Sequence, residues 1–216
     1  MSVYFGTPCY RSDPTLALGW AVAVSNALGL VGSKVSAPCS PFLTTSQAQL
    51  VADFLASRCT HLFFREDDVH IEADVLARML ATGWPAVVAP YLVRGTDRVE
   101  TTVDDEGHVI AAGLGCALLE RRVLEELSAK HDDELHYLQD GVRLVDLTAE
   151  RFVDRPNGRQ KMKGDAAFWS RVREAGFVVR VLEDVVVTHA GRVSHFRPRE
   201  LASDRETPID GTKGAI

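Results

Sequence analysis

The sequence predicts an α/β fold in three layers, with a mixed, mostly parallel central sheet, and three observations support this fold class. Short apolar segments alternate with segments of helical periodicity through the first half of the 216-residue chain. Antiparallel signals enter in the second half, where residues 99–103 and 108–111 flank an Asp-Asp-Glu-Gly turn. The composition, with 46% hydrophobic and 25% charged residues, is typical of a globular domain. We expect one domain over residues 1–200 and a C-terminal tail over residues 201–216.

The first half of the chain contains four predicted strands and three predicted helices. Asp13 followed by Pro14 is a favourable helix start, and Thr44 or Thr45 is the expected cap of the second helix. The predicted strands are residues 2–5, 30–35, 61–64 and 86–89, and the predicted helices are residues 14–28, 45–57 and 72–80.

The second half combines two further helices with an irregular region. Residues 131–164 are polar and weakly periodic, so we expect a partly mobile loop there, with positive charge at residues 151–163. Gly176 is the expected end of the last helix. The remaining predicted strands are residues 115–119, 177–182 and 185–188, and the predicted helices are residues 121–130 and 166–175.

Charge and cysteine content disfavour several classes of protein. A formal charge of −6 opposes wide contact with nucleic acid or an anionic membrane, although a local basic patch could still make one. The four cysteines are widely spaced and show no zinc-binding pattern, so we expect reduced thiols in a cytoplasmic protein. The longest apolar stretch, residues 16–31, is too short and polar for a membrane span.

The strongest chemical feature is the acidic group Glu66-Asp67-Asp68, which follows a predicted buried strand. Open α/β sheets bind ligands at the carboxyl ends of their strands. In an extended chain, Glu66 and Asp68 would point the same way and could share one Mg²⁺ or Mn²⁺ ion. An equally simple interpretation is a solvated turn that caps the following helix.

Residues 61–69, His-Leu-Phe-Phe-Arg-Glu-Asp-Asp-Val, resemble the strand and Asp-x-Asp metal motif of nucleotide-sugar glycosyltransferases with the GT-A fold. Glu66 replaces the first aspartate of that motif. The resemblance continues in the order of the family's motifs to about residue 192. It implies that Mn²⁺ or Mg²⁺ is held by Glu66, Asp68 and His189, the histidine that follows the last apolar strand.

The same resemblance assigns expected roles to other residues. Asp165, at the start of a predicted helix, matches the family's catalytic base, although Gly164 replaces the preceding glutamate and Asp165 could also be a helix N-cap. The other implied contacts are Thr7, Pro8, Tyr10, Gln49 and Asp67 for the donor nucleotide, Gly113, Gly115 and Trp169 for the donor sugar or acceptor, and Lys161, Lys163 and Arg192 for the diphosphate or a lid.

The expected function is therefore metal-dependent transfer of a sugar from a nucleotide-diphosphate sugar to an acceptor hydroxyl. A base at Asp165 favours inversion at the anomeric carbon. A nucleotidyltransferase is one alternative, although the sequence lacks a glycine-rich loop with a basic residue after the first strand. A binding module without turnover is another. The acceptor is open, and the basic stretches keep a modified nucleic-acid base among the candidates.

Overall fold

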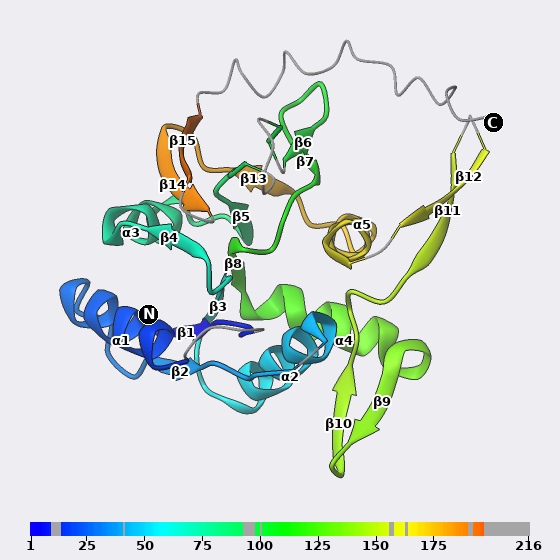
Figure 1. The fold of residues 1–216 in the computed structure, drawn as a ribbon. Coiled ribbons are helices and arrows are strands. Elements are labelled where there is room, and N and C mark those ends of the chain that lie inside the picture. The colour runs from blue at the N-terminus through cyan, green and yellow to red at the C-terminus, as the bar shows by residue number, and fades with distance from the viewer. Residues whose placement is uncertain are drawn as a thin grey trace, which may run out of the picture.

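A six-stranded sheet forms the centre of the computed structural model (Figure 1). The structure describes residues 1–9, 14–40, 42–92, 98–99, 101–155, 158–162, 164–189 and 192–196, with the side chains of residues 155, 186 and 192–196 left out of the description. In spatial order, the sheet consists of β13 (Val179–Val181), β5 (Ala86–Val88), β8 (Cys116–Glu120), β3 (His61–Arg65), β1 (Val3–Gly6) and β2 (Lys34–Ser36).

One strand makes this sheet mixed. Strand β8 runs antiparallel to both of its neighbours, β3 and β5, whereas the other adjacent pairs are parallel. Successive side chains of a strand point to opposite faces, and β3 follows this rule. Leu62 and Phe64 belong to one buried cluster, and Phe63 belongs to the other.

Five helices cover the two faces of the sheet, which gives the predicted three layers (Figure 1). Helices α1 and α3 contribute buried residues to the cluster around Phe63, and α2, α4 and α5 contribute to the cluster around Phe64. The helices are α1 (Pro14–Ala27), α2 (Leu43–Ala56), α3 (Ala73–Thr82), α4 (Arg121–Leu135) and α5 (Gly164–Glu174). Among the described residues, no helix is both long and apolar enough to cross a bilayer.

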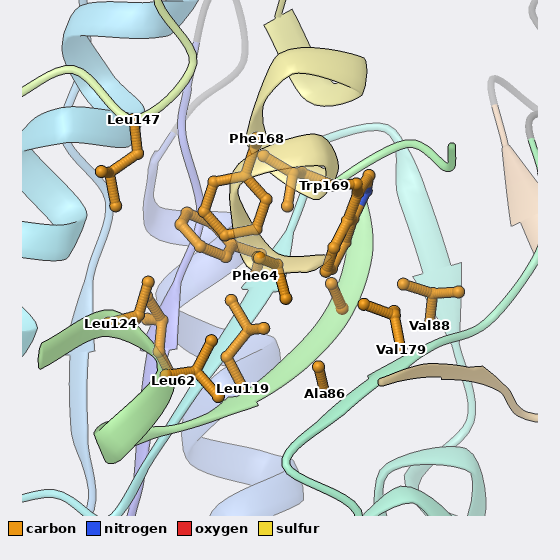
Figure 2. Packing of buried hydrophobic residues seen from close by; sticks show 14 of the residues in the cluster. Leu62, Phe64, Ala86, Val88, Leu119, Leu124, Leu147, Phe168, Trp169 and Val179 are labelled. Atoms are coloured by element: carbon orange, nitrogen blue, oxygen red, sulfur yellow. The ribbon is translucent and has the colours of Figure 1, made fainter. Parts of the chain in front are cut away.

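The core on the α5 side fixes the position of that helix. Figure 2 shows Phe168 and Trp169 reaching from α5 toward Phe64 of the sheet. Both α5 rings are almost fully buried, and their centroids lie 4.9 Å apart in an edge-on arrangement. Burial of each aromatic side chain stabilises the fold by roughly 1.5–3 kcal/mol. The start of α5 is therefore held close to the sheet.

Smaller sheets complete the fold around the ends of the central strands. Strand β14 (Val185–His189) lies between β4 (Val69–Ile71) and β15 (Arg192–Phe196) and is antiparallel to both. Strands β6 (Thr102–Val103) and β7 (Val109–Ala111) form the antiparallel pair expected from the sequence. Strands β4 and β15 were not expected from the sequence, because they are short or highly polar.

The expected loop at residues 131–164 is wrong for most of its length. Helix α4 continues to Leu135, and two antiparallel hairpins follow (Figure 1). The first contains β9 (His136–Gln139) and β10 (Val142–Val145), and the second contains β11 (Arg151–Arg155) and β12 (Gly158–Met162). Both hairpins expose most of their side chains, so their strands lack the apolar alternation that reveals a half-buried strand.

Three element boundaries also differ from the expectation. Residues 31–32 form a turn, and the second strand is confined to Lys34–Ser36. Helix α2 begins at Leu43 after Phe42, which makes no side-chain capping bond, so Thr44 and Thr45 lie inside the first turn. Asp165 is likewise inside α5, as its second residue, and does not precede the helix. The expected tail at residues 201–216 lies outside the described residues.

Candidate metal centre and the adjoining pocket

A tight turn at the carboxyl end of β3 carries the acidic group. The amide of Val69 donates to the carbonyl of Glu66 at 3.1 Å, which closes a four-residue turn. The acidic residues are therefore not extended, contrary to the expected geometry. Even so, the turn brings Glu66 and Asp68 to one side, where both are partly exposed.

His189 reaches this turn because β14 pairs with β4. In the antiparallel register His189 is opposite Val69, the residue that directly follows Asp68. The imidazole is 8% exposed, and its Nε2 lies 3.5 Å from Oδ1 of Asp68. Glu66, Asp68 and His189 each present a ligand atom, and these three atoms all lie within 4.8 Å of one another.

The hydrogen bond on the far side of the imidazole orients it for metal binding. Nδ1 of His189 lies 2.6 Å from the carbonyl oxygen of Leu92. A carbonyl can only accept, so Nδ1 carries the proton and donates to it, which leaves Nε2 to face Asp68. Metal-binding histidines usually donate their other ring N–H to a carbonyl or carboxylate in this way. Two carboxylates and one imidazole fit Mn²⁺, or Mg²⁺ with its preference for oxygen.

Gly115 lies close behind the candidate metal ligands. A Cβ atom added to Gly115 would stand 2.6 Å from Oη of Tyr91 and 2.9 Å from Oε2 of Glu66. The Gly115 amide donates to that tyrosine oxygen at 3.1 Å, and the Gly115 carbonyl accepts from the Glu66 amide at 3.1 Å. The Tyr91 ring in turn contacts the His189 ring, with centroids 4.8 Å apart. The glycine therefore permits a close approach, here between protein groups.

Asp165 contacts the same glycine segment through Leu114. Its Oδ2 accepts from the amide of Leu114 at 2.9 Å, and its Oδ1 lies 3.5 Å from Nε2 of Gln47. Leu114 immediately precedes Gly115, so a single peptide separates the contacts of Asp165 from those of Glu66. Gln47 is buried on α2, and sequence reasoning missed it, since the resemblance to glycosyltransferases pointed to Gln49.

A pocket of about 700 Å³ opens beside Asp165. The residues that line it come from the start of α2, from the segments that follow β7 and β10, and from the start of α5. They are Thr44, Ala111, Ala112, Asp146, Thr148, Ala149, Glu150, Gly164, Asp165 and Ala166. None of the three candidate metal ligands is in this set. The residues that line the pocket and the candidate metal ligands are thus separate sets, and Asp165 connects the pocket to the Leu114–Gly115 segment.

Three of the residues expected to bind the nucleotide lie near the ends of β1 and β2: Thr7, Pro8 and, on α2, Gln49. Thr7 is buried, Pro8 lies beside it, and the Thr7 amide donates to the carbonyl of Ser36. Gln49 donates to Oδ1 of Asp53 at 2.7 Å, and the Ser36 hydroxyl lies 3.4 Å from Oδ2 of that residue. Their nucleotide contact stays a prediction.

Burial affects the acidity of two groups near these residues. It raises the pKa of the Tyr4 phenol, which a hydrogen bond with Ser36 partly offsets. It also raises the pKa of the Cys116 thiol to about 12, so this cysteine stays protonated and is not a nucleophile.

The outcomes for the remaining expected ligand contacts differ from residue to residue. The structure contradicts a direct ligand contact for Trp169, because this side chain is fully buried and its Nε1 donates to the carbonyl of Ala112 at 2.8 Å. Gly113 is buried, with no ligand contact tested.

Lys161 is half exposed on β12 and pairs with Glu150 at 2.6 Å. Asp67 is partly exposed within the turn, and its negative charge acts on the Arg65 guanidinium. Tyr10 and Lys163 lie outside the described residues, and for Arg192 only the backbone in β15 is described.

Comparisons with known proteins add a fold neighbour and no family. No protein-family model and no curated protein matches the chain. The structure is similar to the crystal structure of A197 from STIV, at 14% identity and a TM-score of 0.51, covering 87% of this chain and 84% of that one. This likeness shows a shared fold.

Two structures of HddC from Yersinia pseudotuberculosis align less well. The first has 12% identity, a TM-score of 0.35, and coverage of 57% of this chain and 58% of that chain. The second, complexed with GMP-PN, has 14% identity, a TM-score of 0.33, and coverage of 73% and 72%. Such scores do not establish a shared fold.

Proposed function

We propose that this chain is a divalent-metal-dependent glycosyltransferase of the GT-A fold, which moves a sugar from a nucleotide-diphosphate sugar to an acceptor hydroxyl. The observation that carries the proposal is the placement of Asp165 across one peptide from a metal-type cluster of two carboxylates and an oriented imidazole. In this proposal the donor diphosphate binds beside the cluster and the acceptor binds in the pocket beside Asp165.

In this proposal Glu66, Asp68 and His189 would hold the ion, which would supply positive charge for the leaving nucleoside diphosphate. Leu92 keeps the imidazole in the tautomer that offers Nε2. Tyr91 supports the same ring from the side, and the close approach at Gly115 limits the positions that the Glu66 carboxylate can take.

Asp165 acts as the general base. Its carboxylate accepts the proton of the acceptor hydroxyl while that oxygen attacks the anomeric carbon, and the bond to the nucleoside diphosphate breaks. The hydrogen bond from the Leu114 amide and the contact with Gln47 fix the carboxylate in place. A base on the acceptor side favours inversion at the anomeric carbon.

Two substitutions separate binding from transfer. Asp68→Ala should weaken the Mn²⁺-dependent affinity for a nucleoside diphosphate about 100-fold or more, because it removes a direct ligand. Asp165→Asn should leave that affinity intact and slow sugar transfer about 100- to 10,000-fold, since an amide is not a base. Glu72→Ala is the control, because Glu72 is an exposed carboxylate at the start of α3 that makes no side-chain capping bond.

Titration calorimetry with Mn²⁺ and nucleoside diphosphates, together with product analysis, checks both expectations. Unchanged Mn²⁺-dependent affinity in Asp68→Ala removes the metal site, and transfer at the wild-type rate in Asp165→Asn removes the base. Release of pyrophosphate from a nucleoside triphosphate, in place of nucleoside diphosphate from a nucleotide sugar, identifies a nucleotidyltransferase. Binding without turnover identifies a binding module.

A further inference from the structure

The pocket beside Asp165 has a lining that selects for a particular acceptor chemistry. Its volume of about 700 Å³ lies within the range of small-molecule sites, which is about 300–1,000 Å³. Apart from Asp165, it contains two more carboxylates, Asp146 and Glu150. No lysine, arginine or histidine is among the lining residues that the structure describes.

Neighbouring groups neutralise only part of this negative charge. Lys161 pairs with Glu150 at 2.6 Å, and both side chains are about half exposed. Asp146 accepts from the amide and the hydroxyl of Thr148 at 3.0 and 2.6 Å, and its charge also interacts with the buried guanidinium of Arg171. A phosphate group in this pocket would still face three carboxylates, with no cation among the lining residues that the structure describes.

Hydroxyl groups suit the same lining well. Ionised carboxylates only accept hydrogen bonds, so they pair with the hydroxyl donors of a sugar. The Thr148 hydroxyl donates to Asp146 and thus presents its own lone pairs as acceptors. The remaining surface is made largely of alanine methyl groups at positions 111, 112, 149 and 166, which leave space for the C–H face of a sugar ring.

Helix α5 holds the acidic wall in position. Arg171 is buried, and its Nη1 donates to the carbonyls of Leu147 and Ala149 at 2.8 and 2.9 Å. These two carbonyls lie between Asp146 and Glu150, in the segment that forms one side of the pocket. Because Arg171 and Asp165 belong to the same helix, the wall and the base form one rigid unit.

We infer that the acceptor is a saccharide whose bound portion carries no phosphate, a neutral or amine-bearing sugar, and not a nucleic acid. This inference rests on the proposed function. It restricts the hydroxyl acceptor to a class that the carboxylates, the alanine surface and the volume of this pocket can hold. The basic residues of β12 do not line the pocket, so they give no support to a nucleic-acid acceptor at this position.

Direct binding to the pocket tests the inference without requiring turnover. The probes are methyl glucoside, methyl galactoside, methyl mannoside and methyl glucosaminide, the 6-phosphates of the three neutral glycosides, and a single-stranded oligonucleotide with hydroxymethylated bases. Amide chemical shifts of Thr148, Ala149 and Ala166 in the full chain report occupancy. At least one unphosphorylated glycoside should bind, and its phosphate ester or the oligonucleotide should bind at least about tenfold more weakly.

Charge-changing variants show whether the carboxylates cause this preference. Glu150→Lys should reduce the ratio of the affinity for the glycoside to the affinity for its phosphate ester about tenfold. Glu150→Gln should reduce this ratio less. Glu125→Lys makes the same charge change on α4, outside the pocket, and should leave this affinity ratio unchanged.

The inference is overturned if the phosphate esters or the oligonucleotide bind more tightly than the glycosides. It is also overturned if no glycoside shifts these amides, or if Glu150→Lys behaves like Glu125→Lys. Failure of the proposed function has a different signature, because a glycoside would still occupy the pocket while no nucleoside diphosphate bound with Mn²⁺.

Discussion

The Arg65 guanidinium lies directly behind the turn that carries the candidate metal ligands. It is 3% exposed, its Nη1 donates to the Val69 carbonyl at 2.9 Å, and it stacks over the Trp20 ring at 4.4 Å. Burial lowers the pKa of this guanidinium, while the negative charge of Asp67 opposes the shift. The buried charge therefore joins helix α1 to the end of the Glu66–Val69 turn.

Substitution of Arg65 should weaken metal binding in addition to stability. Arg65→Met keeps an unbranched apolar chain but removes the hydrogen bond to the Val69 carbonyl, which holds the end of the turn in place. We expect a loss of about 1.5–3 kcal/mol in the free energy of unfolding, because the hydrogen bond involves a charged donor. We also expect Mn²⁺ affinity to fall about 10- to 100-fold, which is the usual effect of removing a group that holds metal ligands in position.

Arg121→Met provides the matched control. Arg121 also stacks on a ring, that of Phe54 at 4.6 Å, and donates to backbone carbonyls, including those of Cys59 and Ser57. None of these carbonyls is next to the metal ligands. At a temperature where both variants are folded, Arg121→Met should bind Mn²⁺ like the wild type. Equal affinities in the two variants would show that Arg65 has only a structural role.

Sequence reasoning was most informative about which acidic residues lie at the end of a buried strand. The acidic group after a buried strand pointed to Glu66 and Asp68, and the structure brings both near His189, 121 positions beyond Asp68 in the chain. The turn itself was not predicted, because alternation says which face a side chain takes only while the chain stays extended. Trp169 was misassigned since its position in the helix allowed either a ligand contact or the core.

At the scale of whole elements, polar hairpins were the main difficulty for prediction. Strand β12 is Gly-Arg-Gln-Lys-Met, with nearly every side chain exposed, and β11 places Phe152 under the Arg159 guanidinium at 4.7 Å. These strands are held by cross-strand pairs and backbone bonds, not by one apolar face. A pattern based on burial therefore could not reveal them, whereas it identified β3, β5 and β8 correctly.

The β11–β12 hairpin is in position to respond to the donor. Its base is tied to the pocket through Lys161 and Glu150, and to the end of α5 through Arg151 and Glu174 at 2.7 Å. We expect backbone amides of residues 151–162 to exchange roughly tenfold more slowly when a nucleotide sugar and Mn²⁺ are bound, because the basic side chains then contact the diphosphate.

Hydrogen exchange followed by mass spectrometry measures this change, and the β9–β10 hairpin is the internal control. That hairpin is also antiparallel and largely exposed, but it contains no residue expected to bind phosphate. Its exchange should not change. If residues 151–162 show the same protection with and without ligand, the hairpin is not a lid over the donor.

At the scale of the whole molecule, the candidate metal centre depends on segments that are distant in the sequence. Its ligands come from the turn after β3 and from the end of β14, and Gly115, just before β8, fixes their spacing. Unfolding of any one of these elements would destroy the site. Ligands should therefore bind the native state and not the unfolded chain, and so raise the apparent stability of the entire domain.

This linkage gives a quantitative expectation for thermal unfolding. A nucleoside diphosphate at 100 times its dissociation constant, with Mn²⁺ present, should stabilise the chain by about 2.7 kcal/mol. For a domain of this size, each kcal/mol corresponds to a Tm increase of about 2–4 °C, so the expected shift is about 5–10 °C. Asp68→Ala should have nearly the wild-type Tm without ligand, because Asp68 is partly exposed at a turn, yet it should show little of the shift. Scanning fluorimetry of both proteins, with nucleotide alone, Mn²⁺ alone and the two together, makes the comparison. A full shift with nucleotide alone, or an equal shift in Asp68→Ala, would mean that the nucleotide binds without this metal centre.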